Sequence, residues 1–279
     1  MTKVTGHNGV QLHVTTAGDP ANPPILLVHG WSQHSQSWKH QLAALADQFY
    51  LIAPDLRGHG ASDKPDAPDA YDNSTPWAGD IAAIIDQMGL QNPLLVGWSM
   101  GGWVVQDYIR VHGDSAIAGV TLIGTSVTTG RHSPDGVALK RDADVVARGM
   151  YSDDLAENLA ATQNFIRACT ANPLPADDFA AMLNFNMLVP PHIRRAARYR
   201  HEDYRDTMGK ITVPVQVVWG DKERIALPPM IDQTLASIPG SEPMKMPGLG
   251  HAPFFEDPDQ FNAGLTRFAN RCFSERATA

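Results

Sequence analysis

The chain has 279 residues, of which 43% are hydrophobic and 19% are charged, and its formal net charge at pH 7 is −8. This composition is that of a globular protein that can bury a sizeable core. The acidic balance, with no cluster of lysine and arginine interleaved with aromatic residues, argues against nucleic acid or an anionic membrane surface as a partner.

The N-terminal residues and the cysteines suggest where the protein acts. Residues 1–6 lack the apolar run of a signal peptide, and no stretch of the chain is apolar over a membrane-spanning length. Cys169 and Cys272 lie far apart without metal-ligand spacing, so we expect free thiols. We expect a cytoplasmic protein that acts on a small molecule and needs no cofactor or metal. The sequence leaves the oligomeric state open.

The first half of the chain alternates short apolar runs with helical patterns. Continuous apolar runs predict buried strands, and apolar residues at helical spacing predict helices. The strands expected are 10–17, 25–28, 49–53, 93–96 and 117–123, and the helices expected are 38–48, 76–90 and 102–110. Strands and helices at this rhythm predict the α/β class, with a mostly parallel central sheet flanked by helices.

The rhythm changes after Val127. Residues 128–208 contain no strand-like run, but helical patterns separated by the proline-rich stretches 172–175 and 189–191. We therefore predict a helical cap insertion at 128–208 and a core domain made of 1–127 and 209–279. The core is completed by strands expected at 213–220 and 243–246 and by helices expected at 228–238 and 258–271.

The sequence Gly97-Trp98-Ser99-Met100-Gly101 lies between a predicted strand and a predicted helix. A serine flanked by glycines on such a turn is typical of a nucleophile elbow, because glycines let the backbone segments approach closely. The helix that begins here directs backbone N–H groups, that of Met100 among them, toward negative charge near Ser99. The alternative is a glycine-rich turn that only packs a helix on a sheet.

Polar residues follow several other predicted strands. His29, Asp55 and Thr125 each come directly after or close behind a strand, as Ser99 does. Parallel sheets bind their ligands beyond the carboxyl ends of the strands. The same edge of the sheet is therefore the expected position of an active site, whatever the motif at Ser99 means.

Over essentially its whole length the chain resembles the α/β-hydrolase superfamily. Within the superfamily it is similar to small esterases, to cofactor-free haloperoxidase or perhydrolase-like enzymes, and to carbon–carbon bond hydrolases. The motifs that carry the resemblance are His29-Gly30-Trp31, Asp55-Leu56-Arg57-Gly58-His59-Gly60-Ala61-Ser62, Gly97-Trp98-Ser99-Met100-Gly101-Gly102, Trp219-Gly220 with the acidic residues after it, and Gly248-Leu249-Gly250-His251.

The resemblance implies a catalytic triad in the chain order serine, acid, histidine. Ser99 is the implied nucleophile, and His251 is the base that a serine hydroxyl needs at neutral pH. The superfamily usually places an aspartate three residues after the glycine of Trp219-Gly220, and this position holds Glu223. We expect Glu223 to orient His251. Asp221 is the alternative acid, or else a side chain that stabilises the turn.

The resemblance also implies an oxyanion hole formed by the backbone N–H groups of Trp31 and Met100. The cap leaves and rejoins the sheet at the carboxyl ends of the strands, so we expect it to cover Ser99 with an apolar wall. These side chains could instead only pack the core or the cap. The candidate wall residues are Trp98, Phe165, Met182, Phe185, Met187 and Leu188.

Other residues with catalytic potential have structural interpretations. We expect His29 and His59 to order their loops, and Asp55 and Arg57 to hold theirs through a local ion pair or hydrogen bonds. His201, Glu202 and Asp203 are adjacent, but neighbours on a helix do not share a face, so no metal site is expected. The glycine patterns of nucleotide-binding loops are absent.

These observations predict a serine hydrolase that cleaves a small, fairly apolar ester through an acyl-enzyme. Perhydrolysis, lactone opening and carbon–carbon bond hydrolysis use the same triad and remain open. The alternative from another class is a small-molecule receptor built on a hydrolase scaffold, because fold alone does not fix function.

Overall fold

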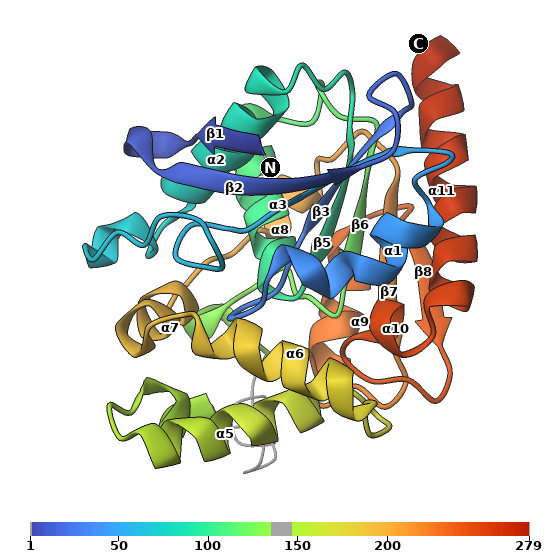
Figure 1. Cartoon of the computed structure of the whole chain (residues 1–279). Helices are drawn as coiled ribbons and strands as arrows, with labels where there is room; N and C mark the ends of the chain where they lie inside the picture. Colours follow the sequence, from blue (N-terminus) through green and yellow to red (C-terminus); the bar gives the residue numbers. More distant parts are fainter. Residues whose placement is uncertain (1, 135–146, 279) are drawn as a thin grey trace.

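The computed structural model describes residues 2–134 and 147–278. An eight-stranded sheet runs through the molecule in the order β1-β2-β4-β3-β5-β6-β7-β8 (Figure 1). The strands are β1 (Thr2–Thr5), β2 (Gln11–Ala17), β3 (Pro24–Val28), β4 (Tyr50–Pro54), β5 (Leu94–Trp98), β6 (Gly119–Ile123), β7 (Val215–Gly220) and β8 (Glu242–Met246). β2 pairs antiparallel with β1 and β4, and the other neighbours are parallel. The predicted α/β class is confirmed.

Helices cover both faces of the sheet. Side chains of a strand alternate between the two faces, so Leu26 and Val28 join one apolar cluster and Ile25 and Leu27 join the other. The first cluster includes α2 and α3, and the second includes α1 and α11. The helices of the predicted core are α1 (Lys39–Ala44), α2 (Ser74–Gln87), α3 (Met100–His112), α9 (Pro228–Ser237), α10 (Pro253–Glu256) and α11 (Pro258–Thr278), and the short α8 (Arg205–Met208) lies at the end of the predicted cap.

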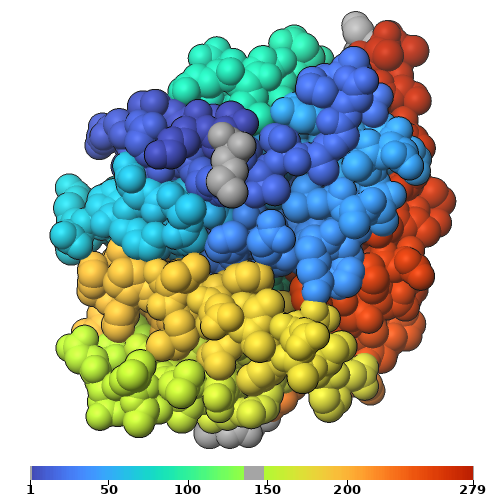
Figure 2. Space-filling model, viewed as in Figure 1, coloured from blue at the N-terminus to red at the C-terminus, as the bar shows by residue number. Residues whose placement is uncertain are grey.

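Three helices of the predicted cap lie together on one side of the sheet. They are α5 (Leu155–Ala168), α6 (Ala176–Met187) and α7 (Pro191–Arg198). Figure 1 places them below the sheet, and in Figure 2 their yellow and yellow-green surface forms one layer against the blue N-terminal half. Residues 135–146 of the predicted cap lie outside the described residues. The boundaries at 127/128 and 208/209 stay predictions.

Several elements differ in extent from those predicted. The helix expected at 38–48 is the short α1, which is preceded by a 3₁₀ turn at Ser35–Trp38. The final helix continues past the predicted end at 271 to Thr278, because residues 272–278 contain no glycine or proline. The strand β1 and the one-turn helix α10 were not predicted. Over 2–134 and 147–278, no helix has both the length and the apolar character needed to cross a membrane.

Candidate active site

Ser99 lies at the sharp turn between β5 and α3. Its backbone has φ 54° and ψ −118°, a conformation that non-glycine residues rarely adopt and that is found at strained functional turns. The turn is held on both sides, because Ser99 N–H donates to the Ile123 carbonyl (2.8 Å) and Thr125 Oγ1 donates to the Ser99 carbonyl (2.8 Å). Ser99 is half-buried between two buried neighbours.

The glycines around Ser99 are required by close backbone contacts. A Cβ at Gly97 would lie 2.6 Å from the Gly101 carbonyl oxygen, and a Cβ at Gly101 would overlap the Val28 carbonyl oxygen. A side chain at either position would therefore push α3 away from β5 or from the end of β3. The Gly-x-Ser-x-Gly pattern thus has a direct steric cause in this fold.

Glu223 and His251 form a buried pair near the end of β7. Glu223 Oε2 lies 2.7 Å from His251 Nδ1, and both side chains are 3% exposed or less. The other oxygen of Glu223 accepts the backbone N–H groups of Ile225 (2.7 Å) and Ala226 (3.1 Å). These two bonds fix the carboxylate, and the carboxylate in turn fixes the imidazole.

Asp221 points elsewhere. Its Oδ1 accepts the backbone N–H of Gly248 (2.7 Å), so it stabilises the turn before His251. The structure therefore brings Glu223, and not Asp221, to the imidazole. Glu223 lies three residues past Gly220, the position at which the superfamily places its acid.

The Glu223–His251 pair lies against the strand end next to Ser99. A Cβ at Gly124 would lie 2.8 Å from His251 Nδ1 and 3.0 Å from Glu223 Oε2. Gly124 directly follows Ile123, whose carbonyl accepts the N–H of Ser99, and Gly124 and Ser99 line the same cavity. Gly124, directly after β6, therefore lies against the Glu223–His251 pair and borders the cavity of Ser99.

Glu256 ties the loop of His251 to the cap. One of its oxygens accepts the N–H of Gly250 (2.6 Å), and the other accepts those of Ala171 (2.7 Å) and Asn172 (3.2 Å). Burial raises the pKa of this carboxyl against the opposing effect of the three N–H donors. Sequence reasoning missed this residue, because the pattern around it gives no sign of the contact with the cap.

Trp31 and Met100 both line the cavity at Ser99. The hydrogen bonds of residues 2–134 and 147–278 give neither backbone N–H an acceptor. Two free N–H donors beside a serine are the arrangement that an oxyanion hole requires. The Trp31 indole N–H is used elsewhere, since it donates to the Arg194 carbonyl (2.8 Å).

The cavity beside Ser99 is narrow, at about 20 Å³, and it adjoins a larger one of about 330 Å³. The two share Trp103, Arg198 and Met230 in their linings. The remaining lining residues of the narrow cavity are Trp31, Ser99, Met100, Gly124, Thr125, Ser126, Ile225 and Ala226.

The six candidate wall residues do not line either cavity. Phe165 does not contact the cavity itself but packs its ring edge-on against that of Trp31, with 5.2 Å between the ring centroids. Trp98 and Met182 are buried, and Phe185 stacks on His34. The Met187 sulfur faces Arg194 (3.9 Å), and Leu188 is 53% exposed.

Buried histidines order the loops around the site. His29 Nε2 accepts the N–H of Leu56 (3.0 Å), and His59 Nε2 accepts the N–H of Ser32 (3.1 Å). Burial lowers the pKa of His29 to about 4 and that of His59 to about 3, so both are neutral at pH 7. This geometry agrees with the loop-ordering role expected for them.

The other charged loop residues also have structural contacts. Asp55 accepts the N–H groups of Ser35 and Ala61. Arg57 forms a buried two-pronged ion pair with Asp80 of α2 (both contacts 2.7 Å), so its partner is distant in sequence and not local. Among the residues that the structure describes, no group of three histidine, cysteine or acidic side chains could hold a metal ion.

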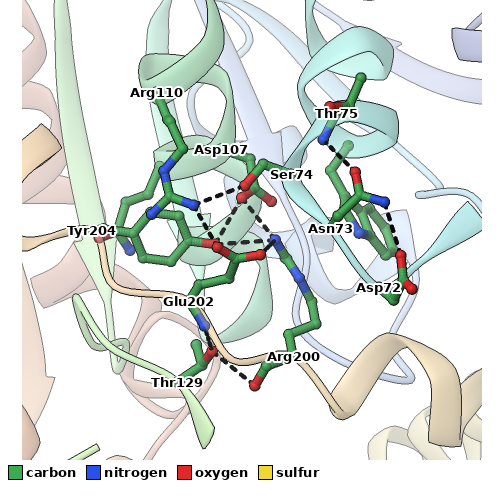
Figure 3. A network of polar contacts seen from close by, with 12 residues as sticks. Asp72, Asn73, Ser74, Thr75, Asp107, Arg110, Thr129, Arg200, Glu202 and Tyr204 are labelled. Atoms are coloured by element: carbon green, nitrogen blue, oxygen red, sulfur yellow. Dashed lines mark hydrogen bonds and ion pairs between the residues drawn. The ribbon is translucent and has the colours of Figure 1, made fainter. Parts of the chain in front are cut away.

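A buried polar network joins α3 to the segment that returns from the cap (Figure 3). Asp107 Oδ1 accepts from Arg200 Nη2 and from the Tyr204 hydroxyl, both at 2.7 Å. Asp107 and Arg200 are fully buried. On the same helix, Arg110 pairs with Glu202 and donates to Ser74 Oγ (3.1 Å). The network fixes the helix whose N-terminus carries Ser99.

With this geometry in place, comparison with known proteins identifies the family. The family model described as "Alpha/beta hydrolase family" matches residues 25–263, so the chain belongs to this family and is a hydrolase. An esterase structure from Rhodococcus sp. ECU1013 is 33% identical and superimposes with a TM-score of 0.89, covering 96% of this chain and 98% of its own.

Two curated relatives extend the comparison. A non-heme haloperoxidase from Rhodococcus erythropolis is 27% identical over 275 residues, which is 95% of this chain and 98% of that protein. Epoxide hydrolase A of Mycobacterium tuberculosis is 39% identical, but over 116 residues only, which is 41% of this chain and 36% of that protein. Relatives with different reactions thus share this fold.

Proposed function

We propose that this hydrolase cleaves small, fairly apolar carboxylic esters, with Ser99 as nucleophile, His251 as base and Glu223 as the orienting acid. The observation that carries the proposal is the 2.7 Å contact between Glu223 and His251 Nδ1. An imidazole that donates its Nδ1–H to a carboxylate keeps Nε2 unprotonated, ready to take a proton from a hydroxyl. The likeness to the Rhodococcus esterase supports the same reaction class.

In the proposed reaction, Ser99 Oγ attacks the ester carbonyl while His251 Nε2 takes the hydroxyl proton. The N–H groups of Trp31 and Met100 stabilise the oxyanion of the tetrahedral intermediate. The intermediate expels the alcohol, which receives the proton from His251, and an acyl group stays on Ser99. Water, activated by the same imidazole, then releases the acid and restores the enzyme.

The cavity lining supports a small, fairly apolar substrate. Trp31, Met100, Ile225 and Met230 surround Ser99, and each is less than 8% exposed. Such a lining excludes water from the reacting bond, and this strengthens the electrostatic contribution of the oxyanion donors. A location in the cytoplasm stays a prediction of the sequence.

Hydrolysis of 4-nitrophenyl acetate, butyrate and octanoate tests the proposal, with Ser99→Ala as control. We expect turnover that favours the shorter chains and is abolished in Ser99→Ala. Turnover that persists in the folded Ser99→Ala variant would contradict the assignment of the nucleophile. Labelling by a fluorophosphonate separates an enzyme from a receptor, because only an activated serine reacts.

The likeness to the haloperoxidase favours a second candidate, perhydrolysis. Hydrogen peroxide would replace water as the acceptor of the acyl group on Ser99, and a peracid would form in place of the acid. The assay measures peracetic acid formed from acetate and hydrogen peroxide. A kcat/KM for perhydrolysis above that for every ester, lactone and vinylogous diketone tested would move the assignment to this reaction.

A further inference from the structure

Arg198, the last residue of α7, lies where the two cavities meet. It lines both the narrow cavity at Ser99 and the larger cavity beside it, together with Trp103 and Met230. Its guanidinium lies over the ring of Trp31, 5.1 Å from the ring centroid. A substrate that extends from Ser99 into the larger cavity therefore passes this cation.

Within residues 2–134 and 147–278, Arg198 has no carboxylate partner. Other arginines close to it are occupied. Arg200 pairs with Asp107, and Arg110 pairs with Glu202. Arg194 donates to the Met150 carbonyl and to Asn158. Arg198 is half-buried, and among the described side chains its guanidinium packs on the face of Trp31.

The surroundings of Arg198 favour an anion. Among the residues that the structure describes, no aspartate or glutamate lines either cavity, although the chain as a whole has a net charge of −8. The polar side chains that the larger cavity contributes include three hydroxyl groups, those of Thr128, Thr129 and Ser133. A guanidinium in such a lining matches a carboxylate, which it binds through two parallel hydrogen bonds.

We propose that Arg198 binds a free carboxylate carried by an otherwise apolar ester, at the end that reaches the larger cavity, so that esters with one such carboxylate are preferred to neutral esters at neutral pH. This inference rests on the proposed esterase function and specifies its substrate class. The carboxylate belongs either to the acyl part, as in a monoester of a dicarboxylic acid, or to the alcohol part. In both cases the guanidinium recognises the same group, while the stacking on Trp31 holds it in place.

Paired substrates test the proposal. Monoethyl glutarate carries the carboxylate in the acyl part and is compared with ethyl hexanoate, while 3-acetoxypropanoate carries it in the alcohol part and is compared with butyl acetate. For one of these pairs, we expect Arg198→Gln to lower the ratio of charged to neutral kcat/KM by roughly 10- to 100-fold, the loss of one charged hydrogen-bonded contact. Arg198→Lys should restore part of the charged-to-neutral ratio, because lysine keeps the positive charge but lacks the planar guanidinium that forms two parallel hydrogen bonds.

Arg195→Gln is the matched control. Arg195 lies on the same helix, is exposed, and packs its guanidinium over Tyr151, and it lines neither cavity. Its variant should leave the charged-to-neutral ratio as in the unsubstituted enzyme. Raising the ionic strength should also lower kcat/KM for the charged ester more than for the neutral one.

A binding measurement makes the result independent of turnover. Calorimetry with Ser99→Ala should detect monoethyl glutarate or 3-acetoxypropanoate, and the added Arg198→Gln change should abolish that binding. If neutral esters are hydrolysed but Arg198→Gln leaves both ratios within twofold, the inference is overturned and the esterase proposal stands. If no ester is hydrolysed, the esterase proposal fails, and binding to Ser99→Ala alone decides the role of Arg198.

Discussion

The indole N–H of Trp98 donates to the backbone carbonyl of His251 at 2.8 Å. The residue before the proposed nucleophile therefore holds the proposed base, although the two are 153 positions apart. The rings of Trp98 and His251 also pack at 5.7 Å. This hydrogen bond holds the end of β5 close to the loop that carries His251.

Removal of this N–H should impair catalysis as well as folding. Trp98→Phe keeps an aromatic ring against Phe254 but leaves the buried His251 carbonyl without its donor, at a cost of about 1–3 kcal/mol. We expect kcat for 4-nitrophenyl butyrate to fall roughly tenfold, equivalent to about 1.4 kcal/mol.

Trp38→Phe is the control for this change. Trp38 is equally buried and packs on the same Phe254 at 4.3 Å, but its indole N–H has no hydrogen-bond partner in the part of the chain that the structure describes. It should lose stability through the smaller ring while retaining kcat. Equal losses of kcat in the two variants would show that packing, and not the bond to His251, is what matters.

The assignment of the acid can be tested by paired amide substitutions. Glu223→Gln should lower kcat by roughly 10³- to 10⁴-fold, because a carboxamide neither holds the Nδ1–H tautomer nor stabilises the imidazolium. Asp221→Asn keeps an oxygen that can accept the Gly248 N–H, so it should cost far less. Steady-state kinetics on the two folded variants measures both effects. A larger loss of kcat in Asp221→Asn than in Glu223→Gln would make Asp221 the acid.

The buried pair of Asp107 and Arg200 should be costly to break. Asp107→Asn removes the carboxylate 2.7 Å from the buried Arg200 and leaves only Glu202, at 3.6 Å, to offset that charge, and breaking a buried pair typically costs about 3–5 kcal/mol. Asp206→Asn is the comparison, because Lys210 and Asp206 form an exposed pair and such pairs contribute roughly 0–1 kcal/mol. Urea unfolding measures both. Similar losses of unfolding free energy in the two variants would show that burial does not set the cost of breaking an ion pair in this protein.

The two neutral histidines predict a loss of stability in acid. In the unfolded chain each imidazole binds a proton below about 6.5, but in the folded protein only below about 4 for His29 and about 3 for His59. Between these values the unfolded chain binds more protons, so the free energy of unfolding falls as the pH falls. Each histidine contributes up to about 1.4 kcal/mol per pH unit.

Urea titrations at pH 7.5, 6.0 and 5.0 measure this dependence. His59→Gln removes one titrating group and should reduce the slope of the unfolding free energy against pH. If the slope in His59→Gln equals that of the unsubstituted protein, the acid sensitivity originates in other groups.

The sequence predicts the sheet well because its parallel strands are buried on both faces. β3, β5 and β6 appear as continuous apolar runs, and the elbow appears as glycines that close contacts require. β1 was missed because Val4 is its only buried residue, so its pattern carries no alternation to detect. α10 was missed because four residues are too few for a helical period.

The lining of the active site was not predictable in the same way. Trp103, Arg198 and Met230 come from three helices far apart in sequence, and only the packing of the whole chain brings them to Ser99. Five of the candidate wall residues were chosen because the cap leaves and rejoins the sheet at the carboxyl ends of the strands, and Trp98 was chosen because it lies in the elbow. A helical pattern identifies an apolar face, but it does not identify what that face contacts.

The pairing of Arg200 with Asp107 also determines where this enzyme can be recombined with its relatives. Arg200 and Tyr204 lie within the predicted cap, yet their partner is on α3 of the core. A hybrid joined at 128 and 208 would receive a foreign return segment and would lose both contacts of Asp107. A hybrid joined after Thr129 and before Arg200 would exchange α5, α6 and α7, with Arg198 among them. It would keep the native contacts of Asp107 with Arg200 and Tyr204, which hold the return segment to α3.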